Sequence, residues 1–254
     1  MGRGDIIPPI NLWFVTIVIA GVVLMASSYQ PTPGQPYLAT NQPAGLYYNG
    51  PETTALAGYY CIASINSSNG FSIQLNALLD NGEWAQVVYS VPPVGQPGLA
   101  VNVWDGAVLL HAFFVPINAP CAWLVVSINN NVLYVGYSLD GENVTWFDEY
   151  KVGYASIEPG PSTELVLGGY GLGAQAQLGN GTLVRLALYY WGNNGWAPAP
   201  AGVFSVFTNC SGRCASATEA VGGAWVFTNG TCGGVVSWPN PVNETVCPVP
   251  GFEP

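Results

Sequence analysis

The stretch STELVLGGYGLGAQAQLGNGTLVRLALYYW, residues 162–191, sets the pattern that recurs along the chain. Two apolar runs, Glu164–Leu167 and Leu183–Trp191, flank a segment rich in glycine. Short apolar and aromatic runs bounded by turn residues are typical of β-strands. The stretch therefore predicts two strands joined by a glycine-rich turn, with one carboxylate, Glu164, at the start of the first strand.

The same pattern continues over most of the remaining sequence. Asp80-Asn81-Gly82 and Asn129-Asn130-Asn131 lie between consecutive runs, where hairpin loops are expected. No amphipathic helix of useful length follows residue 30. Many short strands at this spacing predict an all-β fold, either an antiparallel β-sandwich or a jelly roll of the concanavalin-like kind. The other predicted strands are Phe71–Leu79, Trp84–Val91, Leu99–Trp104, Ala107–Val115, Trp123–Ile128, Val132–Ser138 and Val144–Phe147.

Charged residues make up only 7% of the chain, against roughly 25% in an ordinary globular protein. Lys and Arg together number four and the formal net charge is −10, which excludes nucleic acid as a partner because a phosphate backbone needs cations. Few ion pairs exist for acid to break, so we expect stability in acid. With a single histidine, carboxylates are the candidate catalysts, and this points to acidic conditions.

The N-terminal part predicts export. Residues 12–26 are apolar and, with their flanks, approach the ~20 residues that cross a bilayer. They form either a hydrophobic helix retained as a signal-anchor, with the membrane as its partner, or a signal peptide cleaved near Ala26-Ser27-Ser28. Both alternatives place the rest at the extracellular face, anchored or secreted. The predicted divisions are 1–28 for this segment, 29–54 for a Pro/Gly-rich linker, 55–206 for the β-sandwich and 207–254 for a Cys-rich tail packed on or extending it.

Six cysteines in an exported chain predict disulfides rather than a metal site. Cys210 and Cys214 have the spacing of half a zinc site, but a matching half is missing from the sequence. Six Asn-X-Ser/Thr sequons fit a glycosylated outer surface. The disulfide candidates are Cys61, Cys121, Cys210, Cys214, Cys232 and Cys247, and the glycosylation candidates are Asn66, Asn143, Asn180, Asn209, Asn229 and Asn243.

Several chemistries lack their motifs. The sequence has no HExxH, no GxSxG and no GxxxxGK[ST], and Gly168–Gly173 does not open a helix within a βαβ unit. His111 lies in an apolar run and is predicted to be a buried or edge histidine rather than a catalytic base. We therefore expect no cofactor and no catalytic metal.

Glu164 and Gln86 remain as the catalytic candidates. On a strand, Glu164 shares a face with Val166, and a partly apolar surrounding raises the pKa of a carboxyl by desolvation. An amide beside such an acid can donate a hydrogen bond to a developing oxyanion while the acid activates water. The structural alternative is a surface Glu at a strand start and a Gln paired with the backbone.

The order of several motifs resembles the thermopsin family, secreted acid peptidases of thermoacidophilic archaea. The resemblance covers roughly Tyr59 to Val221 and implies an archaeal acid endopeptidase. At position 162, where the family usually has an acidic residue, this chain has Ser162, which implies possible loss of activity; the Cys-rich tail is a second departure. The motifs are Ser72–Asn76, Trp84–Val88, Val101–Trp104, Glu164–Gly171, Ala187–Trp191, Trp196–Pro200 and Ala217–Ala220.

A Glu and Gln pair on a β-sandwich is also used by the eqolisin glutamic peptidases, an analogy at the level of the fold. On this basis Glu164 and Gln86 are the predicted catalytic residues. Gln74 and Asp105 are held in reserve, and Trp104 and Tyr170 are the predicted substrate-binding residues.

Three functions are compatible with these features. The first is an exported endopeptidase that acts on peptides or unfolded proteins through water activated by Glu164. The second is a non-catalytic surface module whose aromatic residues bind carbohydrate or mediate adhesion. The third is a structural subunit of an envelope or filament. The sequence does not determine the oligomeric state.

Overall fold

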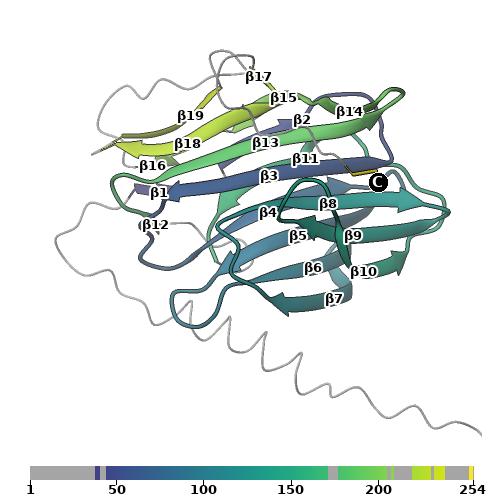
Figure 1. Ribbon diagram of the computed structural model, residues 1–254, viewed down its shortest axis with the longest axis horizontal. Coiled ribbons are helices and arrows are strands. Elements are labelled where there is room, and N and C mark those ends of the chain that lie inside the picture. The colour runs from purple at the N-terminus through teal and green to yellow at the C-terminus, as the bar shows by residue number, and fades with distance from the viewer. Residues whose placement is uncertain are drawn as a thin grey trace, which may run out of the picture. The chain divides into compact units, whose positions relative to one another are not determined.

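The computed structural model describes residues 38–40, 44–170, 177–204, 207–208, 219–229, 232–237 and 252–253. These residues form two eight-stranded sheets and one three-stranded sheet, and all their strand pairs are antiparallel. Figure 1 shows the two larger sheets lying face to face. The all-β prediction is therefore confirmed, whereas the jelly-roll alternative stays a prediction.

The first sheet is built around β3 and β13, which pair with each other and with one further strand of the sheet order on their other edges. In spatial order its strands are β10 (Thr145–Lys151), β9 (Val132–Ser138), β8 (Cys121–Asn129), β3 (Ala55–Ser64), β13 (Leu183–Gly192), β18 (Gly223–Asn229) and β19 (Cys232–Ser237), with β14 (Gly195–Pro198) also paired to β13.

The second sheet contains a meander of four consecutive strands at one end. In spatial order its strands are β17 (Glu219–Val221), β15 (Pro200–Phe204), β2 (Ala44–Tyr48), β11 (Gly160–Gly168), β4 (Phe71–Leu78), β5 (Glu83–Val91), β6 (Gly98–Asp105) and β7 (Val108–Pro116). The small sheet has the order β12 (Gln177–Leu178), β1 (Leu38–Thr40), β16 (Phe207–Thr208).

Tight turns join the hairpins where the sequence predicted them. Asn130 and Asn131 have φ of 51° and 66°, and two consecutive left-handed residues form the type I′ turn that matches strand twist. Gly82, with φ of 87°, closes the β4–β5 turn and donates its N–H to the Leu79 carbonyl over 2.9 Å. These turns set the β4–β5 and β8–β9 registers.

The main core lies between the two larger sheets. Alternate residues of each strand point inward, as the period of two requires. Leu75, Val87 and Leu165 of the second sheet are fully buried and belong to the same apolar cluster as Leu124 and Val126 of the first. The outward positions of these strands are therefore the ones available for a functional site.

The outer face of the first sheet carries a second, smaller apolar cluster. Trp123 packs against Tyr189, with ring centroids 5.5 Å apart, and against Phe252 near the C-terminus, at 6.4 Å. The indole N–H of Trp196 donates to the Phe252 carbonyl over 2.7 Å. This part of the sheet is thus buried on both faces.

Strand β2 lies within the segment predicted as a linker. Its side chains Ala44, Leu46 and Tyr48 are fully buried, and β2 pairs with β11 and β15. The flanking Pro43 and Asn49-Gly50-Pro51 are turn residues that resemble a linker in composition. The strand exists because the sheet supplies partners on both of its edges.

The N-terminal apolar segment, residues 12–26, lies outside the described residues, so the predicted helix, its cleavage and the export of the chain stay predictions. Within the described part, no helix has the length and hydropathy needed to cross a bilayer.

Two of the six candidate disulfide cysteines are joined to each other. Cys61 on β3 and Cys121 on β8 occupy directly opposite positions and form a disulfide. Cys232 lies on β19, whereas Cys210, Cys214 and Cys247 lie outside the described residues. A disulfide is typical of a protein that folds in an oxidising compartment.

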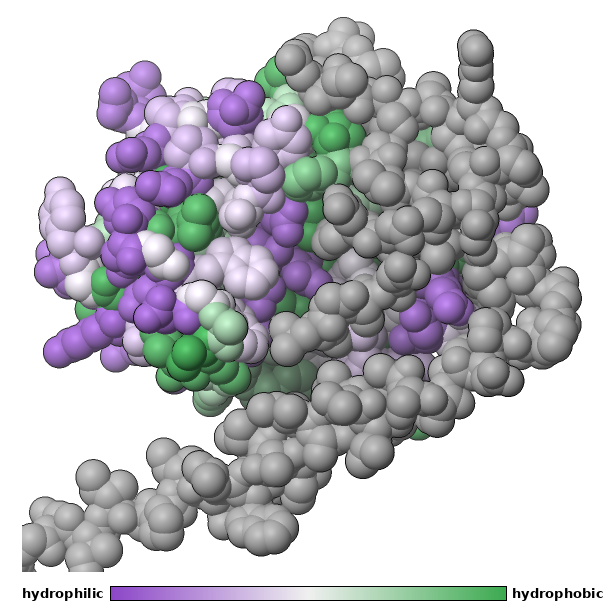
Figure 2. Space-filling model, turned by 180° about the vertical axis from the view of Figure 1, so that it is seen from behind, coloured by the Kyte–Doolittle hydropathy of each residue, from purple (hydrophilic) through white to green (hydrophobic). Residues whose placement is uncertain are grey.

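Figure 2 views the molecule from the back of Figure 1 and shows a mostly hydrophilic coloured surface with a compact hydrophobic group near its lower edge. Strand β7 is the lowest strand in Figure 1 and is an edge strand with several exposed apolar side chains. These are Val108, Leu110, Phe113 and Phe114, which are 61%, 39%, 44% and 54% exposed.

Candidate active site

A row of polar side chains crosses the outer face of the second sheet, the face opposite the core. In register, Glu164 on β11 pairs with Asn76 on β4, and Asn76 pairs with Gln86 on β5. Their sequence neighbours Leu75 and Val87 point into the core, so the row points outward. Strand pairing alone therefore places a carboxyl and two amides side by side.

Hydrogen bonds connect the row. The Asn76 amide Nδ2 donates to Glu164 Oε1 over 2.8 Å, and Gln86 Nε2 donates to Asn76 Oδ1 over 3.1 Å. Asn76 is 1% exposed and Gln86 is 4% exposed, so both amides are removed from water. Glu164 and Gln86 thus belong to one network, but Asn76 stands between them.

Neighbouring side chains hold the Gln86 amide on both sides. Trp104 Nε1 donates to Gln86 Oε1 over 3.0 Å, and Gln86 Nε2 also approaches Gln74 Oε1 at 3.5 Å. Gln74 in turn donates to Ser72 Oγ over 2.7 Å. The contact at 3.5 Å is at the weak limit for a hydrogen bond, so it is the one that Gln86 gives up most easily.

Burial raises the pKa of Glu164 to about 7, and the hydrogen bond from Asn76 opposes part of this shift. Desolvation disfavours the charged form of a carboxyl, whereas a donated hydrogen bond stabilises that form. Glu164 is therefore a carboxyl that gains and loses its proton near neutrality, and a group with such a pKa can both accept and return a proton during a reaction.

The second carboxyl oxygen of Glu164, Oε2, has no hydrogen-bond partner among the described residues. Two depressions in the described surface, of about 500 and 460 Å³, do not include Glu164. The row instead runs across β11, β4 and β5 on the outer face of the sheet.

Two other predicted site residues lie away from this network. Asp105 pairs with Glu83 at the end of β6, on the same face as the core residue Val103, and its side chain is exposed. Tyr170 follows the end of β11, where the Ser72 hydroxyl donates to the Gly169 carbonyl over 2.8 Å. Gln74, Gln86, Glu164 and Trp104 are brought together, whereas Asp105 and Tyr170 are not.

Ser162 lies two residues before Glu164 on β11 and is exposed. Its carbonyl oxygen accepts a hydrogen bond from the indole Nε1 of Trp84 over 3.1 Å. Trp84 therefore contacts β11 at residue 162, the position where the resemblance to the thermopsin family led us to expect an acidic residue.

Asn76 was not among the predicted site residues. The signal was present in the sequence, because Ser72, Gln74 and Asn76 alternate with Ile73 and Leu75 and mark a polar face of the strand. The alternation does not reveal which carboxyl this face meets, since the partner Glu164 is 88 residues away.

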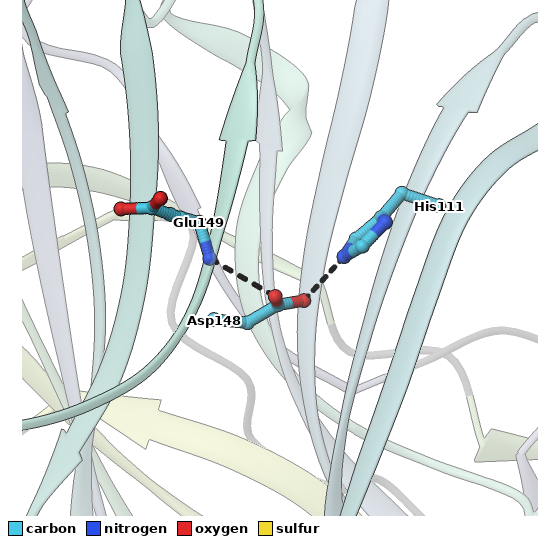
Figure 3. Close-up of polar contacts among 3 residues, drawn as sticks. All are labelled: His111, Asp148 and Glu149. Atoms are coloured by element: carbon cyan, nitrogen blue, oxygen red, sulfur yellow. Dashed lines mark hydrogen bonds and ion pairs between the residues drawn. The ribbon is translucent and has the colours of Figure 1, made fainter. Parts of the chain in front are cut away.

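A second polar contact lies at the edge of the sandwich (Figure 3). His111 on β7 and Asp148 on β10 are 2.6 Å apart between Nε2 and Oδ2, and Asp148 Oδ1 accepts the Glu149 backbone N–H over 3.0 Å. The imidazole also lies 5.5 Å from the Tyr150 ring. His111 is an edge histidine, one of the two placements predicted from its apolar run, and its contact with Asp148 links the two sheets.

No cluster of His, Cys, Asp and Glu in the described part has the geometry to hold a metal ion. Three predicted glycosylation sites, Asn66, Asn143 and Asn180, are exposed, and Asn229 lies on β18. Asn209 and Asn243 lie outside the described residues. Occupancy of these sites stays a prediction.

No protein-family model and no curated protein sequence matches the chain. Among solved structures, the chain is similar to Scytalido-glutamic peptidase bound to a peptide-based transition-state analogue, with a TM-score of 0.44 and 11% identity over 73% of this chain and 98% of that chain. It is also similar to a functionally unknown protein from Saccharomyces cerevisiae, with a TM-score of 0.32 and 14% identity over 57% of this chain and 75% of that chain. The thermopsin resemblance stays a prediction.

Proposed function

We propose that the chain is an exported, thermopsin-like endopeptidase that hydrolyses peptide bonds with Glu164 as its proton-transferring group. The observation that carries the proposal is the hydrogen-bonded row of Glu164, Asn76 and Gln86, in which burial raises the pKa of the carboxyl to about 7. Perturbed carboxyls held by specific partners are concentrated at catalytic sites. The disulfide and the N-terminal sequence support export.

In the proposed reaction, the ionised Glu164 takes a proton from water while the water oxygen attacks the peptide carbonyl carbon. The protonated Glu164 then returns the proton to the leaving amine nitrogen, and the C–N bond breaks. Asn76 holds Oε1 by its hydrogen bond, which leaves Oε2 to meet the water. One carboxyl can perform both transfers because a group whose pKa lies near the working pH readily accepts a proton and readily returns it.

Gln86 is the proposed donor to the oxyanion of the tetrahedral intermediate. Its Nε2 would exchange the 3.5 Å contact with Gln74 for the substrate oxygen, while Trp104 and Asn76 keep the amide in place. A donor that is already held loses little freedom when the charge develops, which is why such donors accelerate acyl transfer.

Aromatic side chains flank the row on the same face of the sheet. Tyr47 on β2 pairs with Glu164 at one end of the row. Trp84 and Trp104 pair with each other two residues along their strands from Gln86 and its partner Asn102. All three are half-buried. They are the proposed subsites for large apolar side chains of an unfolded substrate.

The raised pKa of Glu164 refines the expected pH range. A base with a pKa of about 7 loses its ionised form tenfold for each pH unit below that value. The proposal therefore favours weakly acidic solution, between about pH 5 and pH 7, over strong acid.

The test is cleavage of reduced, alkylated lysozyme by the full chain, followed from pH 2 to pH 8 by mass spectrometry of the products. We expect Glu164→Gln to lower kcat/KM by about 10²- to 10⁴-fold, the usual contribution of a general acid–base group. Glu142→Gln is the matched control, because Glu142 is an exposed loop carboxyl.

Thermal unfolding of each variant separates loss of chemistry from loss of the fold. Absence of cleavage by the wild-type chain at every pH would contradict the proposal. Equal cleavage by a folded Glu164→Gln variant would move the chemistry to another residue.

A further inference from the structure

An aromatic depression lies on the outer face of the first sheet, the sheet that does not carry Glu164. Its volume is about 500 Å³, within the ~300–1,000 Å³ range of small-molecule sites. Ser127 on β8, Tyr134 on β9 and Glu149 on β10 occupy one register row across it. The row faces outward, since the neighbouring Val126 and Val135 belong to the core. Its lining includes Ser127, Asn129, Tyr134, Trp146 and Glu149.

Trp146 forms a flat floor in this depression. It pairs with Gly136, and a Cβ on Gly136 would lie 2.8 Å from Cε3 of the indole, so the ring rests directly on the glycine backbone. The indole stays 40% exposed, and Tyr134 stands edge-on to it with ring centroids 6.1 Å apart. One ring face therefore lies on the sheet while the side chain remains open to a ligand.

Polar side chains form the rim. A β-bulge between Trp146 and Asp148 turns Asp148 inward to His111, and Figure 3 shows the Glu149 carboxylate directed away from that contact. Asn129 lies two residues after Ser127 on the same side of β8. The rim thus offers hydroxyl, amide and carboxylate groups around an aromatic floor.

The charge of the depression restricts its ligand. The described lining contains Asp148 and Glu149 and no Lys or Arg. Phosphates, sulfates and uronic acids would meet repulsion from the Glu149 carboxylate, and the exposed Lys151, two residues further along β10, lies outside the lining. A ligand with one apolar face and a rim of neutral hydroxyl groups fits both the floor and the rim.

We propose that this depression is a binding site for a neutral pyranose sugar. The C–H groups on one face of a pyranose ring stack on the electron-rich face of Trp146. The hydroxyl groups at the ring edge donate to the Glu149 carboxylate and exchange hydrogen bonds with Asn129 and Ser127. The site is independent of Glu164 and would hold the protein on a glycan while leaving the peptidase face free.

The test is native affinity electrophoresis of the full chain in gels that contain mannan, starch or hydroxyethyl cellulose, with polygalacturonate as the anionic comparison. We expect retardation by at least one neutral polysaccharide and none by polygalacturonate. Calorimetry with the hexasaccharide of the retarding polymer then gives the affinity. Trp146→Ala should weaken binding by about tenfold, which corresponds to about 1.4 kcal/mol.

Glu149→Gln is the second variant, because it keeps the shape of the side chain and removes the negatively charged hydrogen-bond acceptor. We expect this variant to fold and to bind the sugar more weakly. Tyr154→Ala is the matched control, since Tyr154 is 90% exposed on a loop. Glu164→Gln should bind sugar like the wild type.

Absence of retardation by all three neutral polysaccharides overturns the proposal. Unchanged binding by both Trp146→Ala and Glu149→Gln also overturns it. If Trp146→Ala instead lowers lysozyme cleavage and leaves sugar binding intact, the depression takes peptide rather than sugar.

Discussion

Replacement of Glu164 by Gln tests the electrostatics of the site without any assumption about catalysis. Gln has nearly the same shape as a protonated Glu, and its Oε1 can accept the hydrogen bond that Asn76 donates over 2.8 Å. The substitution therefore removes the titration of this carboxyl and little else. We expect the variant to be more stable than the wild type at neutral pH.

The magnitude follows from the pKa. Burial raises the pKa of Glu164 from 4.5 to about 7. Below pH 4.5 the carboxyl is protonated in both the folded and the unfolded chain. Between about pH 4.5 and pH 7 the folded protein keeps the proton and the unfolded chain releases it, so stability falls as pH rises. The full loss is about 3 kcal/mol, at about 1.4 kcal/mol for each pH unit.

Urea unfolding at pH 4 and pH 8 measures the effect. At pH 4 the variant and the wild type should have similar free energies of unfolding. At pH 8 the variant should be more stable by about 3 kcal/mol, which is roughly 6–12 °C in the midpoint of thermal unfolding. The exposed Glu142→Gln variant should show no comparable gain. The decisive quantity is the difference in free energy of unfolding between the Glu164→Gln variant and the wild type. If this difference is the same at pH 8 as at pH 4, the burial argument is refuted.

Two further predictions concern the same structure. Asn76→Leu leaves the Gln86 Nε2 without its 3.1 Å acceptor and Glu164 without its donor, so we expect a loss of about 1–3 kcal/mol in urea unfolding and a further rise in the pKa of Glu164. Equal stability of this variant and the wild type would contradict the network. Replacement of both Cys61 and Cys121 by Ala should cost about 2–4 kcal/mol, because their disulfide closes a sequence separation of 60; an unchanged urea midpoint would show that the crosslink contributes nothing.

The strands of the sandwich are largely readable from local pattern. Predicted Val132–Ser138 coincides with β9, and predicted Trp84–Val91 differs from β5 by one residue at its start. These predictions succeed because apolar and polar residues alternate along a half-buried strand. The turns contain Asn130-Asn131 and Gly82, which adopt the positive φ values that tight turns require. Strand β2 was not predicted, because its five residues lie between turn residues and their strand conformation depends on pairing with β11 and β15.

The sequence by itself determined the all-β class. It also predicted that nucleic acid is not a partner, from the low content of Lys and Arg, and it singled out Glu164 and Gln86 as candidate site residues. Only the tertiary structure decided that Asn76 stands between them. The β4–β5 turn sets the pairing of residues 76 and 86, but the pairing of β4 with β11, which brings residue 164 beside residue 76, joins strands far apart in the sequence. The same holds for His111 and Asp148, which come from edge strands of different sheets. Burial, and with it the raised pKa of Glu164, is likewise a property of the packed sheet, because desolvation depends on what surrounds a carboxyl in space rather than on its neighbours in sequence.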